Sequence, residues 1–570
     1  MKKIIYSIAI LMTAVSLSGC SDFFNPVTND VLLEKSYVGQ YGELYSGYMG
    51  ITASVQAVAD KGSFIEGLQG DLLEPTENAP REMWDIYNRA TDLTNNSIAD
   101  PKGYYNVILN ANDYLVHIFK YYNNDSTTLS KTTLNGLVGG ALRYKAWAYL
   151  MLAKIYGEAI YLDDPLTSYQ DITKYPVLKF DDVIEKCRQL VEVGVNGVNG
   201  KGDIQWSSAL FPNQGASATS LSWDRICPPP ECLLAEIYLY QNNYQKVKDN
   251  CISLINSGGA QQSYQLNLWG GNGQWAPLGY SFARYEHIAV AFYNYSLHQT
   301  NHLIDYYSNT YPNKYYLRPT TVAMNRFATQ LTSGGALGDK YRGNGVTYKL
   351  VNGAWVLEKF LAGNETSATI YTNDVQFSLY RAADIHLFLI EALVGLGQFD
   401  QALPFLNNGV GSYYDATAGR FNHPFEGYPS YLFKADNTRG SNQGVRFRVS
   451  LGNVGLYALN SKTAMDTLVN MRRLDSLIVE EVSLEFAGEA KAFYTMNRIA
   501  RRWSADAPKS WAQHWTDRVG SANPGNLWGT DVQTVWAGKV GAKYTNGSGT
   551  KVSSSLSSDL NNWFIKYRLN

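Results

Sequence analysis

The sequence carries little charge and few cysteines. Charged residues make up 17% of 570 residues, the net charge is −2, and no long basic tract occurs. Because nucleic-acid binding needs clustered Lys and Arg to neutralise phosphates, this composition argues against a nucleic-acid partner. Beyond the first 20 residues, no apolar run is long enough for a transmembrane helix. The chain is instead rich in aromatic residues, with 42 Tyr and 13 Trp, and their polar tips require water or a partner.

The five cysteines form no recognisable metal or redox motif. No CxxC pair exists and no histidine stands at zinc-ligand spacing, so we predict no metal site. Cys232 and Cys251 fall on apolar faces of expected helices, as small core residues do. Cys227 and Cys232 flank three prolines, a geometry from which no disulfide follows.

Motifs of common enzyme classes are absent as well. The sequence has no GxSxG elbow, no P-loop and no GxGxxG fingerprint. The string HQTNH places His298 and His302 four residues apart but lacks the Glu that a zinc hydrolase uses as general base. A glycosidase needs two carboxylates facing one bond, whereas the adjacent Asp163 and Asp164 tend to point apart. We predict a protein that is not an enzyme and that needs no cofactor, and a carboxylate pair brought together by folding is the alternative that the sequence leaves open.

The N-terminus has the form of a secretory signal. Two lysines precede a short apolar run that ends in the string LSGC, and this order is typical of a signal peptide. Small residues directly before a cysteine resemble a bacterial lipobox, which implies cleavage before Cys20 and acylation of that residue; the alternative is an ordinary signal peptide with an incidental cysteine. We predict a signal peptide at 1–19, a lipidated tether at 20–40 and a single body at 41–570 held at a membrane by lipid.

The body is organised around a helical hairpin at 377–409. Its apolar residues recur at helical spacing, for example at Ile385, Leu389, Ala392 and Leu396. Gly397 is suited to ending the helix, and Pro404 is expected in or near the first turn of the next one. The string at 230–255 aligns with this hairpin, so that Glu236 matches Glu391 and Tyr244 matches Phe399. Repeated hairpins of this kind indicate a mainly α fold built from tetratricopeptide-like units.

Other segments give simpler expectations. Helices are expected at 41–58, 104–122, 134–157 and 180–195, and a helical segment at 461–503. The acidic and basic residues of 480–502 are expected to form a solvated, mutually paired helix face. The segment 65–87 is expected to be a loop, and the chain from Trp511 onward to be irregular.

Four strings resemble one known family. They are ALRYKAWAYLMLAKIYGEAIYL at 141–162, NVILNAND at 106–113, the two hairpins, and EEVSLEFAGEAKAFYTMNRIARRW at 480–503. Together they resemble the SusD/RagB family of outer-membrane nutrient-binding lipoproteins, over essentially the whole chain with the lipobox included. The resemblance implies a SusD-like fold in which helical repeats at about 104–257 and 377–503 flank a ligand-binding insertion at about 258–376.

The resemblance also implies where a ligand binds. In SusD-like proteins the glycan site is an aromatic arc built from an early loop and the region between the repeat hairpins. Aromatic rings stack on the flat faces of sugars, and polar side chains bond to their hydroxyls. The residues of this sequence at those places, with a further candidate at the entrance to the 377–397 helix, are Trp84, Asp71, Trp269, Trp275, His298, Asn301, Tyr306, Tyr307, Tyr311 and Arg381. Core packing is the alternative for each.

The resemblance finally implies a role. A lipid-anchored protein on the outside of the outer membrane would capture an oligosaccharide and deliver it to a SusC-like TonB-dependent barrel. One alternative is a peptide cargo for the same kind of transporter. Another is a tetratricopeptide-like adaptor for a protein partner, and a lipid-anchored glycoside hydrolase is the weakest. Aromatics clustered on the insertion would favour ligand capture, whereas aromatics lining the helical groove would favour the adaptor.

Overall fold

The computed structural model describes residues 38–165, 174–206, 225–257, 264, 266, 276–279, 286–361, 374–428, 443–456, 458, 464–503, 531–544 and 547–569. The described chain is mainly α-helical, as predicted. Its helices are α3 (Tyr41–Ala59), α4 (Lys61–Gln69), α5 (Arg81–Tyr87), α6 (Lys102–Asn124), α7 (Lys131–Tyr156), α8 (Phe180–Glu192), α10 (Pro230–Tyr240), α11 (Tyr244–Ser257), α12 (Leu303–Tyr307), α13 (Thr321–Ala328), α14 (Ala382–Gly395), α15 (Phe399–Leu406), α16 (Ala464–Glu485), α17 (Ala492–Arg502), α20 (Asp531–Gly541) and α21 (Gly549–Ser558).

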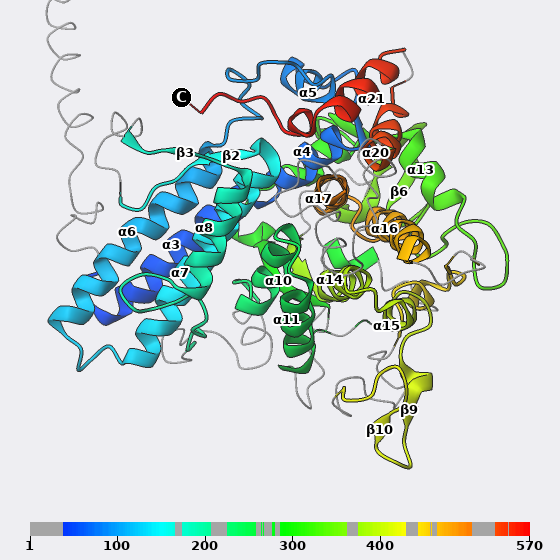
Figure 1. Ribbon diagram of the computed structural model, residues 1–570. Helices are drawn as coiled ribbons and strands as arrows, with labels where there is room; N and C mark the ends of the chain where they lie inside the picture. The colour runs from blue at the N-terminus through cyan, green and yellow to red at the C-terminus, as the bar shows by residue number, and fades with distance from the viewer. Residues whose placement is uncertain are drawn as a thin grey trace, which may run out of the picture.

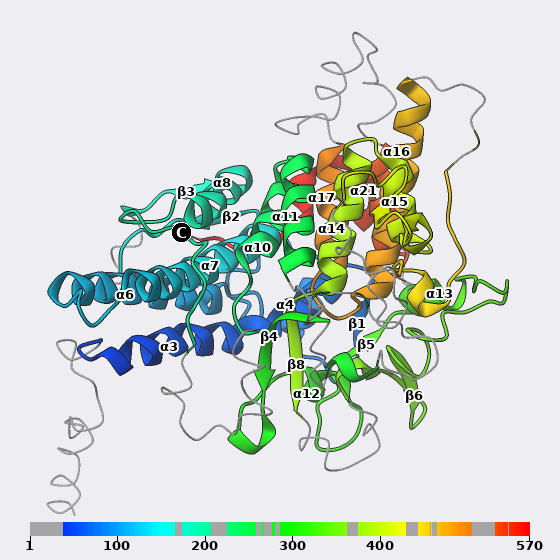
Figure 2. The ribbon, with the colours of Figure 1, turned by 90° about the horizontal axis from the view of Figure 1, so that it is seen from below.

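The strands of the described residues pair antiparallel in twos. The pairs are β1 (Leu73–Pro75) with β5 (Leu317–Pro319), β2 (Glu158–Ile160) with β3 (Val177–Lys179), β4 (His287–Tyr293) with β8 (Val375–Arg381), β6 (Tyr348–Val351) with β7 (Ala354–Leu357), and β9 (Tyr414–Asp415) with β10 (Arg420–Phe421). Figure 2 shows β4, β8, α12, β5 and β6 grouped on one side of the molecule, away from α11, α15 and α16.

Helix α7 runs through the middle of the N-terminal helical half (Figure 1). Every residue from Gly136 to Tyr156 is buried, which explains why its apolar residues do not keep to one face. Ser130 caps the start by accepting a hydrogen bond from the Thr133 N–H at 3.1 Å. Gly157 ends the helix with φ at +75°, a conformation that glycine adopts without strain.

The two predicted hairpins are α10 with α11 and α14 with α15, and α11 packs beside α14. The helix expected from residue 377 instead begins at Ala382, because 375–381 form strand β8 paired with β4. Val375, Phe377 and Leu379 alternate with Gln376 and Ser378, as is typical of a strand, but the helical spacing that continues from Leu379 into α14 was extended back over them. Pro404 lies inside α15 rather than in its first turn.

Two segments expected to be irregular contain helices. The early segment 65–87 includes the end of α4, strand β1 and helix α5, so Trp84 is helical. Helices α20 and α21 occupy 531–558 despite many glycines and serines, because they pack on each other and bury Trp536 and Leu556. A Cβ on Gly541 would meet the Ser553 Oγ at 1.9 Å, so glycine permits the close approach. Local propensity was overridden by packing.

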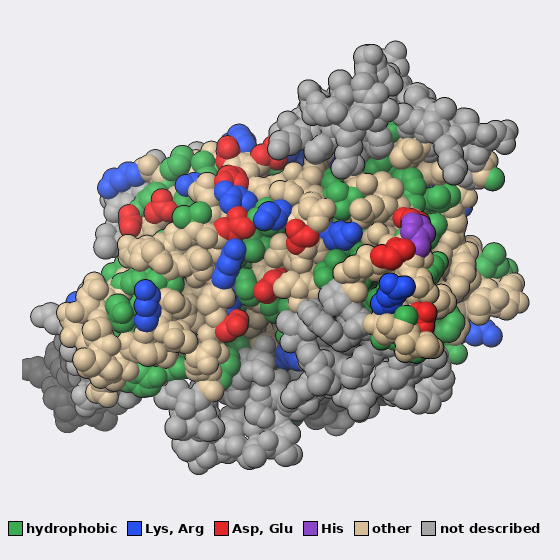
Figure 3. Space-filling view, turned by 60° about the horizontal axis from the view of Figure 1, so that its bottom comes forward, with side chains coloured by type: hydrophobic (Ala, Val, Ile, Leu, Met, Phe, Trp, Pro, Cys, Tyr) green, Lys and Arg blue, Asp and Glu red, His purple; other side chains and the backbone are tan. Residues whose placement is uncertain are grey.

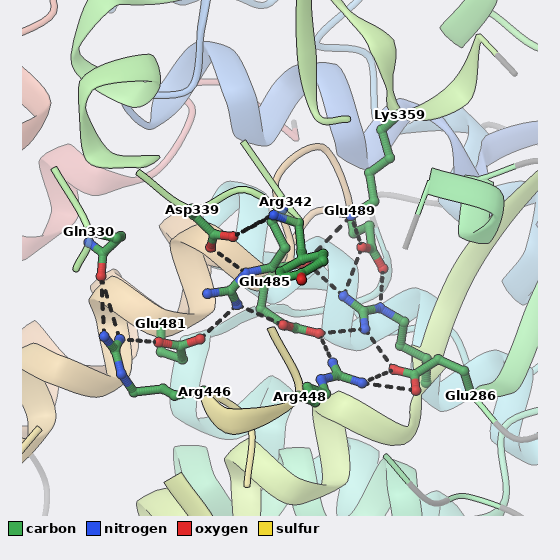
Figure 4. A network of polar contacts seen from close by, with 12 residues as sticks. Glu286, Gln330, Asp339, Arg342, Lys359, Arg446, Arg448, Glu481, Glu485 and Glu489 are labelled. Atoms are coloured by element: carbon green, nitrogen blue, oxygen red, sulfur yellow. Dashed lines mark hydrogen bonds and ion pairs between the residues drawn. The ribbon is translucent and has the colours of Figure 1, made fainter. Parts of the chain in front are cut away.

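The charges near 480–502 are paired, as predicted, but they are buried rather than solvated. Figure 4 shows the resulting network, in which carboxylates of α16 and the residues after it meet arginines from distant segments. Arg342 contacts Glu481 at 2.7 Å and Glu485 at 2.8 Å, and none of these side chains is exposed. Arg446 contacts the other side of Glu481 at 2.7 Å. Sequence spacing indicated pairing within a helix, but the partners come from elsewhere in the fold.

The helical repeats hold matched buried acids. Glu236 pairs with Lys154 at 2.8 Å, and Glu391 pairs with Arg498 at 2.7 Å and also with Arg502. Their equivalence in the sequence alignment therefore extends to a shared role as buried carboxylates that join neighbouring helices. Cys232 and Cys251 are buried free thiols, as predicted.

The described surface is mixed in charge. On the face seen in Figure 3, Lys and Arg side chains are interspersed with Asp and Glu among small hydrophobic areas. Over the described ranges, no helix combines the length and apolar content needed to cross a membrane.

Candidate aromatic binding site

The insertion between the hairpins is joined to the early segment by strand pairing. Strand β5 pairs with β1, so Leu73 lies opposite Pro319, and the Thr76 N–H donates to the Tyr316 carbonyl at 2.8 Å. Strand β4 pairs with β8 at the entrance of α14. The two regions that the sequence predicted to form one site are therefore neighbours in space.

Four rings and one lysine gather around α12 and the segment that follows it. We call Phe64, His302, Tyr306, Tyr316 and Lys314 the aromatic group. The His302 and Tyr306 ring centroids are 5.2 Å apart, those of Tyr306 and Tyr316 are 5.1 Å apart, and Phe64 meets Tyr306 edge-on at 5.4 Å. Tyr306 and Tyr316 are half-buried, and the His302 side chain is 53% exposed. The result is a short row of rings, backed by Phe64, that reaches solvent.

Charged groups fix this row in place. The buried Asp60 carboxylate accepts hydrogen bonds from the His302 backbone N–H at 2.7 Å and meets the His302 Nδ1 at 3.0 Å. The hydrogen bond to Asp60 raises the pKa of His302, and nearby carboxylates add to this effect while burial opposes it. The His302 ring is therefore held in one orientation beside Tyr306.

Lys314 lies near the rings of Tyr306 and Tyr316. Its Nζ lies 6.0 Å from the Tyr306 ring centroid and 5.7 Å from that of Tyr316, and it pairs with Asp305 at 2.8 Å. The hydrogen bond that Lys314 donates to the Asp305 carboxylate raises the pKa of Lys314. The group thus offers ring faces and edges together with hydrogen-bond donors on an imidazole and an ammonium, which suits a ligand with both apolar C–H surface and hydroxyls.

No family model matches the sequence, and the comparison with curated proteins found no match. Solved structures do match. A SusD superfamily protein from Bacteroides vulgatus aligns with a TM-score of 0.53 at 12% identity, over 81% of this chain and 89% of that chain. A SusD-like protein from Bacteroides fragilis aligns with a TM-score of 0.53 at 16% identity, over 82% and 88%. A SusD superfamily protein from Bacteroides thetaiotaomicron aligns with a TM-score of 0.50 at 14% identity, over 93% and 98%.

The chain has the SusD-like fold. The predicted resemblance is confirmed at the level of the fold, and the coverage extends across most of the chain.

Within this SusD-like fold, several predicted site residues lie at the surface of the insertion. Tyr306 belongs to the aromatic group. Tyr311 is 87% exposed, on the segment between α12 and β5. His298 is exposed at the end of a short 3₁₀ turn, with φ at +57°, and so does not share a helix with His302. The Asn301 side chain accepts hydrogen bonds from the backbone of α12 at 3.0 and 3.3 Å, which positions this helix.

Trp84 belongs to a different cluster. It is 37% exposed on α5 and packs edge-on against Tyr87, with ring centroids 5.8 Å apart. Tyr87 in turn contacts Tyr544 at 4.8 Å. Trp84 thus presents an exposed ring at the surface next to the C-terminal helices, apart from the row around His302.

Three predicted residues are in the interior. Tyr307 has no exposed surface, and its hydroxyl lies 2.7 Å from that of Ser63. Asp71 is buried in an ion pair with Arg326 that ties the early segment to α13. Arg381 is fully buried among carboxylates. All three are buried in this structure, and the contacts described here are with other residues of the chain.

Trp269 and Trp275 lie outside the described residues, as does Cys20. Sequence reasoning did not select Phe64, His302, Lys314 or Tyr316 as site residues. The string YPNKYY at 311–316 contains two of them, and its density of tyrosines was the available signal. Among the described residues, no group of three or more His, Cys, Asp or Glu side chains is arranged to hold a metal ion.

Proposed function

We propose that this protein captures an oligosaccharide through the aromatic group and delivers it to a SusC-like TonB-dependent transporter in the outer membrane. The observation that carries this proposal is the row of His302, Tyr306 and Tyr316, whose rings follow one another at 5.2 and 5.1 Å while reaching solvent. The membership of the SusD-like fold supports the transporter partner.

The physical argument rests on pre-organisation. The rings are held by Phe64 behind them and by the contact of His302 with Asp60, so little side-chain entropy remains to be lost on binding. Ring faces attract the C–H faces of pyranoses, and the His302 and Lys314 donors can bond to hydroxyls at the edge of the row. Exposed Tyr311, on the same connecting segment, extends the apolar surface.

The position of the rings favours capture of a small ligand over an adaptor role. The aromatic group lies on the insertion and on α4, and not along a groove between the repeat helices α10, α11, α14 and α15. A peptide cargo remains the second candidate, because the same rings can stack against peptide side chains.

The decisive experiment is isothermal titration calorimetry of the protein against a panel of polysaccharides and a peptide digest. We expect the wild type to bind glycan and the double variant Tyr306→Ala/Tyr316→Ala to bind it at least about tenfold more weakly. Stacking of a nucleic-acid base on an aromatic side chain contributes about 1–3 kcal/mol, and stacking of a sugar on a ring uses similar contacts. Tyr414→Ala is the matched control, because Tyr414 is a half-buried tyrosine on the β9–β10 hairpin and does not belong to the aromatic group. Binding of peptides alone would overturn the glycan proposal, and equal affinities in both variants would remove the site.

We further propose that residues 1–19 are a signal peptide, that Cys20 is acylated, and that the tether at 20–40 holds the body outside the outer membrane. The supporting observation is the LSGC string after an apolar run. Cys20→Ala should move the protein from the membrane fraction to the soluble fraction of cells. The wild type should co-purify with the transporter from detergent extracts, and absence of the transporter from the purified sample would count against the SusC-like partner.

A further inference from the structure

A cleft of about 680 Å³ lies where the C-terminal segment crosses the end of α7 and the start of α8. The segment is fixed on both sides of the cleft, because the Ile565 N–H donates to the Ile155 carbonyl at 2.9 Å and the Leu93 N–H donates to the Lys566 carbonyl at 2.8 Å. In Figure 1 this region lies beside β2, β3 and the C-terminus. None of the residues that line it belongs to the aromatic group. Its volume is in the range of sites for small ligands.

The floor of the cleft is a guanidinium held against two aromatic rings. The Arg501 Cζ lies 4.2 Å from the Phe180 ring centroid and 5.8 Å from that of Phe564, and the two ring centroids are 5.6 Å apart. Both rings are buried, whereas one fifth of the Arg501 side chain is exposed. The stacking restricts the orientation of the planar guanidinium, and Arg501 is among the residues that line the cleft.

Arg501 has few hydrogen-bond acceptors close to its guanidinium. Its nearest carboxylate oxygen within the described ranges is the Asp181 Oδ1 at 3.6 Å, which makes this a long and weak contact. Its neighbour Arg502 is different, because that guanidinium bonds to Asp475 at 2.9 Å and to Glu391. Burial lowers the pKa of Arg501, and the attraction of Asp181 with its weak hydrogen bond only partly offsets this effect.

The rim of the cleft adds a further cation. Lys179 pairs with Glu158, and Arg568 pairs with Asp92 at 2.9 Å. Lys566 donates only to the Asn561 carbonyl at 2.6 Å, and no described carboxylate lies within ion-pair distance of it. The residues lining the cleft therefore include four cations against three carboxylates, namely Lys179, Arg501, Lys566 and Arg568 against Asp92, Glu158 and Asp181.

We propose that this cleft is a second ligand site, which binds the carboxylate of a small organic acid through Arg501 and Lys566. A carboxylate offers two parallel acceptors that match the forked donors of a guanidinium, and it would supply the acceptors that Arg501 lacks. The same chemistry occurs in a uronic acid at the end of a glycan and in the free carboxylate of a short peptide. The site is separate from the aromatic group, so it stands whether or not that group binds glycans.

The test is calorimetry of the full chain with three probes: digalacturonate, its neutral counterpart galactobiose, and trialanine. We expect binding of digalacturonate, of trialanine or of both, no binding of galactobiose at this site, and weaker binding as salt is raised. Digalacturonate binding without trialanine binding assigns the site to acidic sugars, and the reverse assigns it to peptides. Failure of both acids to bind at millimolar concentration, or equal affinity for galactobiose, overturns the proposal.

Variants locate the site. Arg501→Gln should weaken binding of the acid by about tenfold or more, because hydrogen bonds to charged groups are worth about 1.5–3 kcal/mol. Arg188→Gln is the matched control, because Arg188 on α8 lies outside the cleft and its side chain is 26% exposed, close to the 20% of Arg501. Should Arg501→Gln fail to fold, Lys566→Gln, at a half-buried rim position, should still weaken binding several-fold. Unchanged affinity in the folded cleft variants overturns the proposal, whereas Tyr306→Ala/Tyr316→Ala should leave acid binding intact.

Discussion

Replacing Arg381 with methionine should destabilise the protein without touching its ligand site. Arg381 donates to Glu489 at 2.8 and 3.0 Å, to Glu286 at 2.8 Å, and to the Glu485 carboxylate and carbonyl at 2.8 and 2.7 Å. The side chains of these carboxylates are at most 4% exposed. Methionine would fill much of the space but would leave three buried carboxylates short of one cation.

The magnitude follows from the burial of these charges. Removing one partner of a buried ion pair typically costs about 3–5 kcal/mol, because the remaining charge is left uncompensated in a medium of low polarity. Unfolding entropies of about 2.1 cal/mol/K per residue give this chain about 1.2 kcal/mol/K at its melting temperature. The expected fall in Tm for Arg381→Met is therefore about 2.5 to 4 °C.

Differential scanning calorimetry at one scan rate near pH 7 measures this change. Arg81→Met is the matched control, since the Arg81 side chain is 89% exposed and pairs with Asp85 only at 3.6 Å, so its Tm should change by less than about 0.5 °C. Folded Arg381→Met should bind glycan as the wild type does, because Arg381 has no exposed surface. A Tm shift no larger than that of the control would refute the reasoning, and a selective loss of glycan affinity would return Arg381 to the ligand site.

Three further outcomes are expected. Burial raises the pKa of Glu485, but the nearby arginines outweigh burial and hold the pKa at about 2, below the ordinary 4.5. The stability that the ionised Glu485 contributes above pH 4.5 should therefore be lost as the pH falls toward 2. A Tm that stays constant between these pH values would contradict this. Asp60→Asn should lower the pKa of His302 in an NMR titration of its ring, because the hydrogen bond to Asp60 raises that pKa in the wild type. The contribution of this pair to wild-type stability should be complete below pH 6.5 and should decline as the pH rises through the pKa of folded His302. Gly157→Ala should destabilise the protein by more than about 1 kcal/mol, since the φ of Gly157 is +75° and a Cβ would meet a phenylalanine ring at 2.4 Å. Gly197→Ala is the control, because its φ is +77° and a Cβ would meet nothing within 4 Å, so it should show backbone strain alone. Equal losses of stability in denaturant titrations of the two variants would rule out an effect of the ring contact.

Much of the helical scaffold was predictable because its signals are local. Helical spacing located α7 and the helices of both hairpins to within a few residues, and glycine marked the end of α7. The boundary between β8 and α14 was misplaced, because Leu379 also fits the helical spacing of α14 and this outweighed the short alternation of Val375, Phe377 and Leu379 with polar residues. Helices α20 and α21 were missed because tertiary packing overrode weak local propensity.

The candidate site was predictable only as a neighbourhood. The tyrosine-rich string around residues 306–316 contains members of the aromatic group, but Tyr306 reaches the surface while Tyr307 is buried against Ser63. Sequence could not separate them, because adjacent residues of a helix point to different sides and the direction of the core was unknown. Phe64 joins the rings from more than 200 residues away, which no local pattern reports.

By itself, the sequence determined the mainly α scaffold, the equivalence of Glu236 and Glu391 in the two aligned hairpins, and the region in which aromatic side chains gather. Only the tertiary structure decided which rings are exposed and which charges are buried. The physical reason is that helix formation depends on residues three or four apart, whereas the burial of a ring or an ion pair depends on partners brought together from distant parts of the chain.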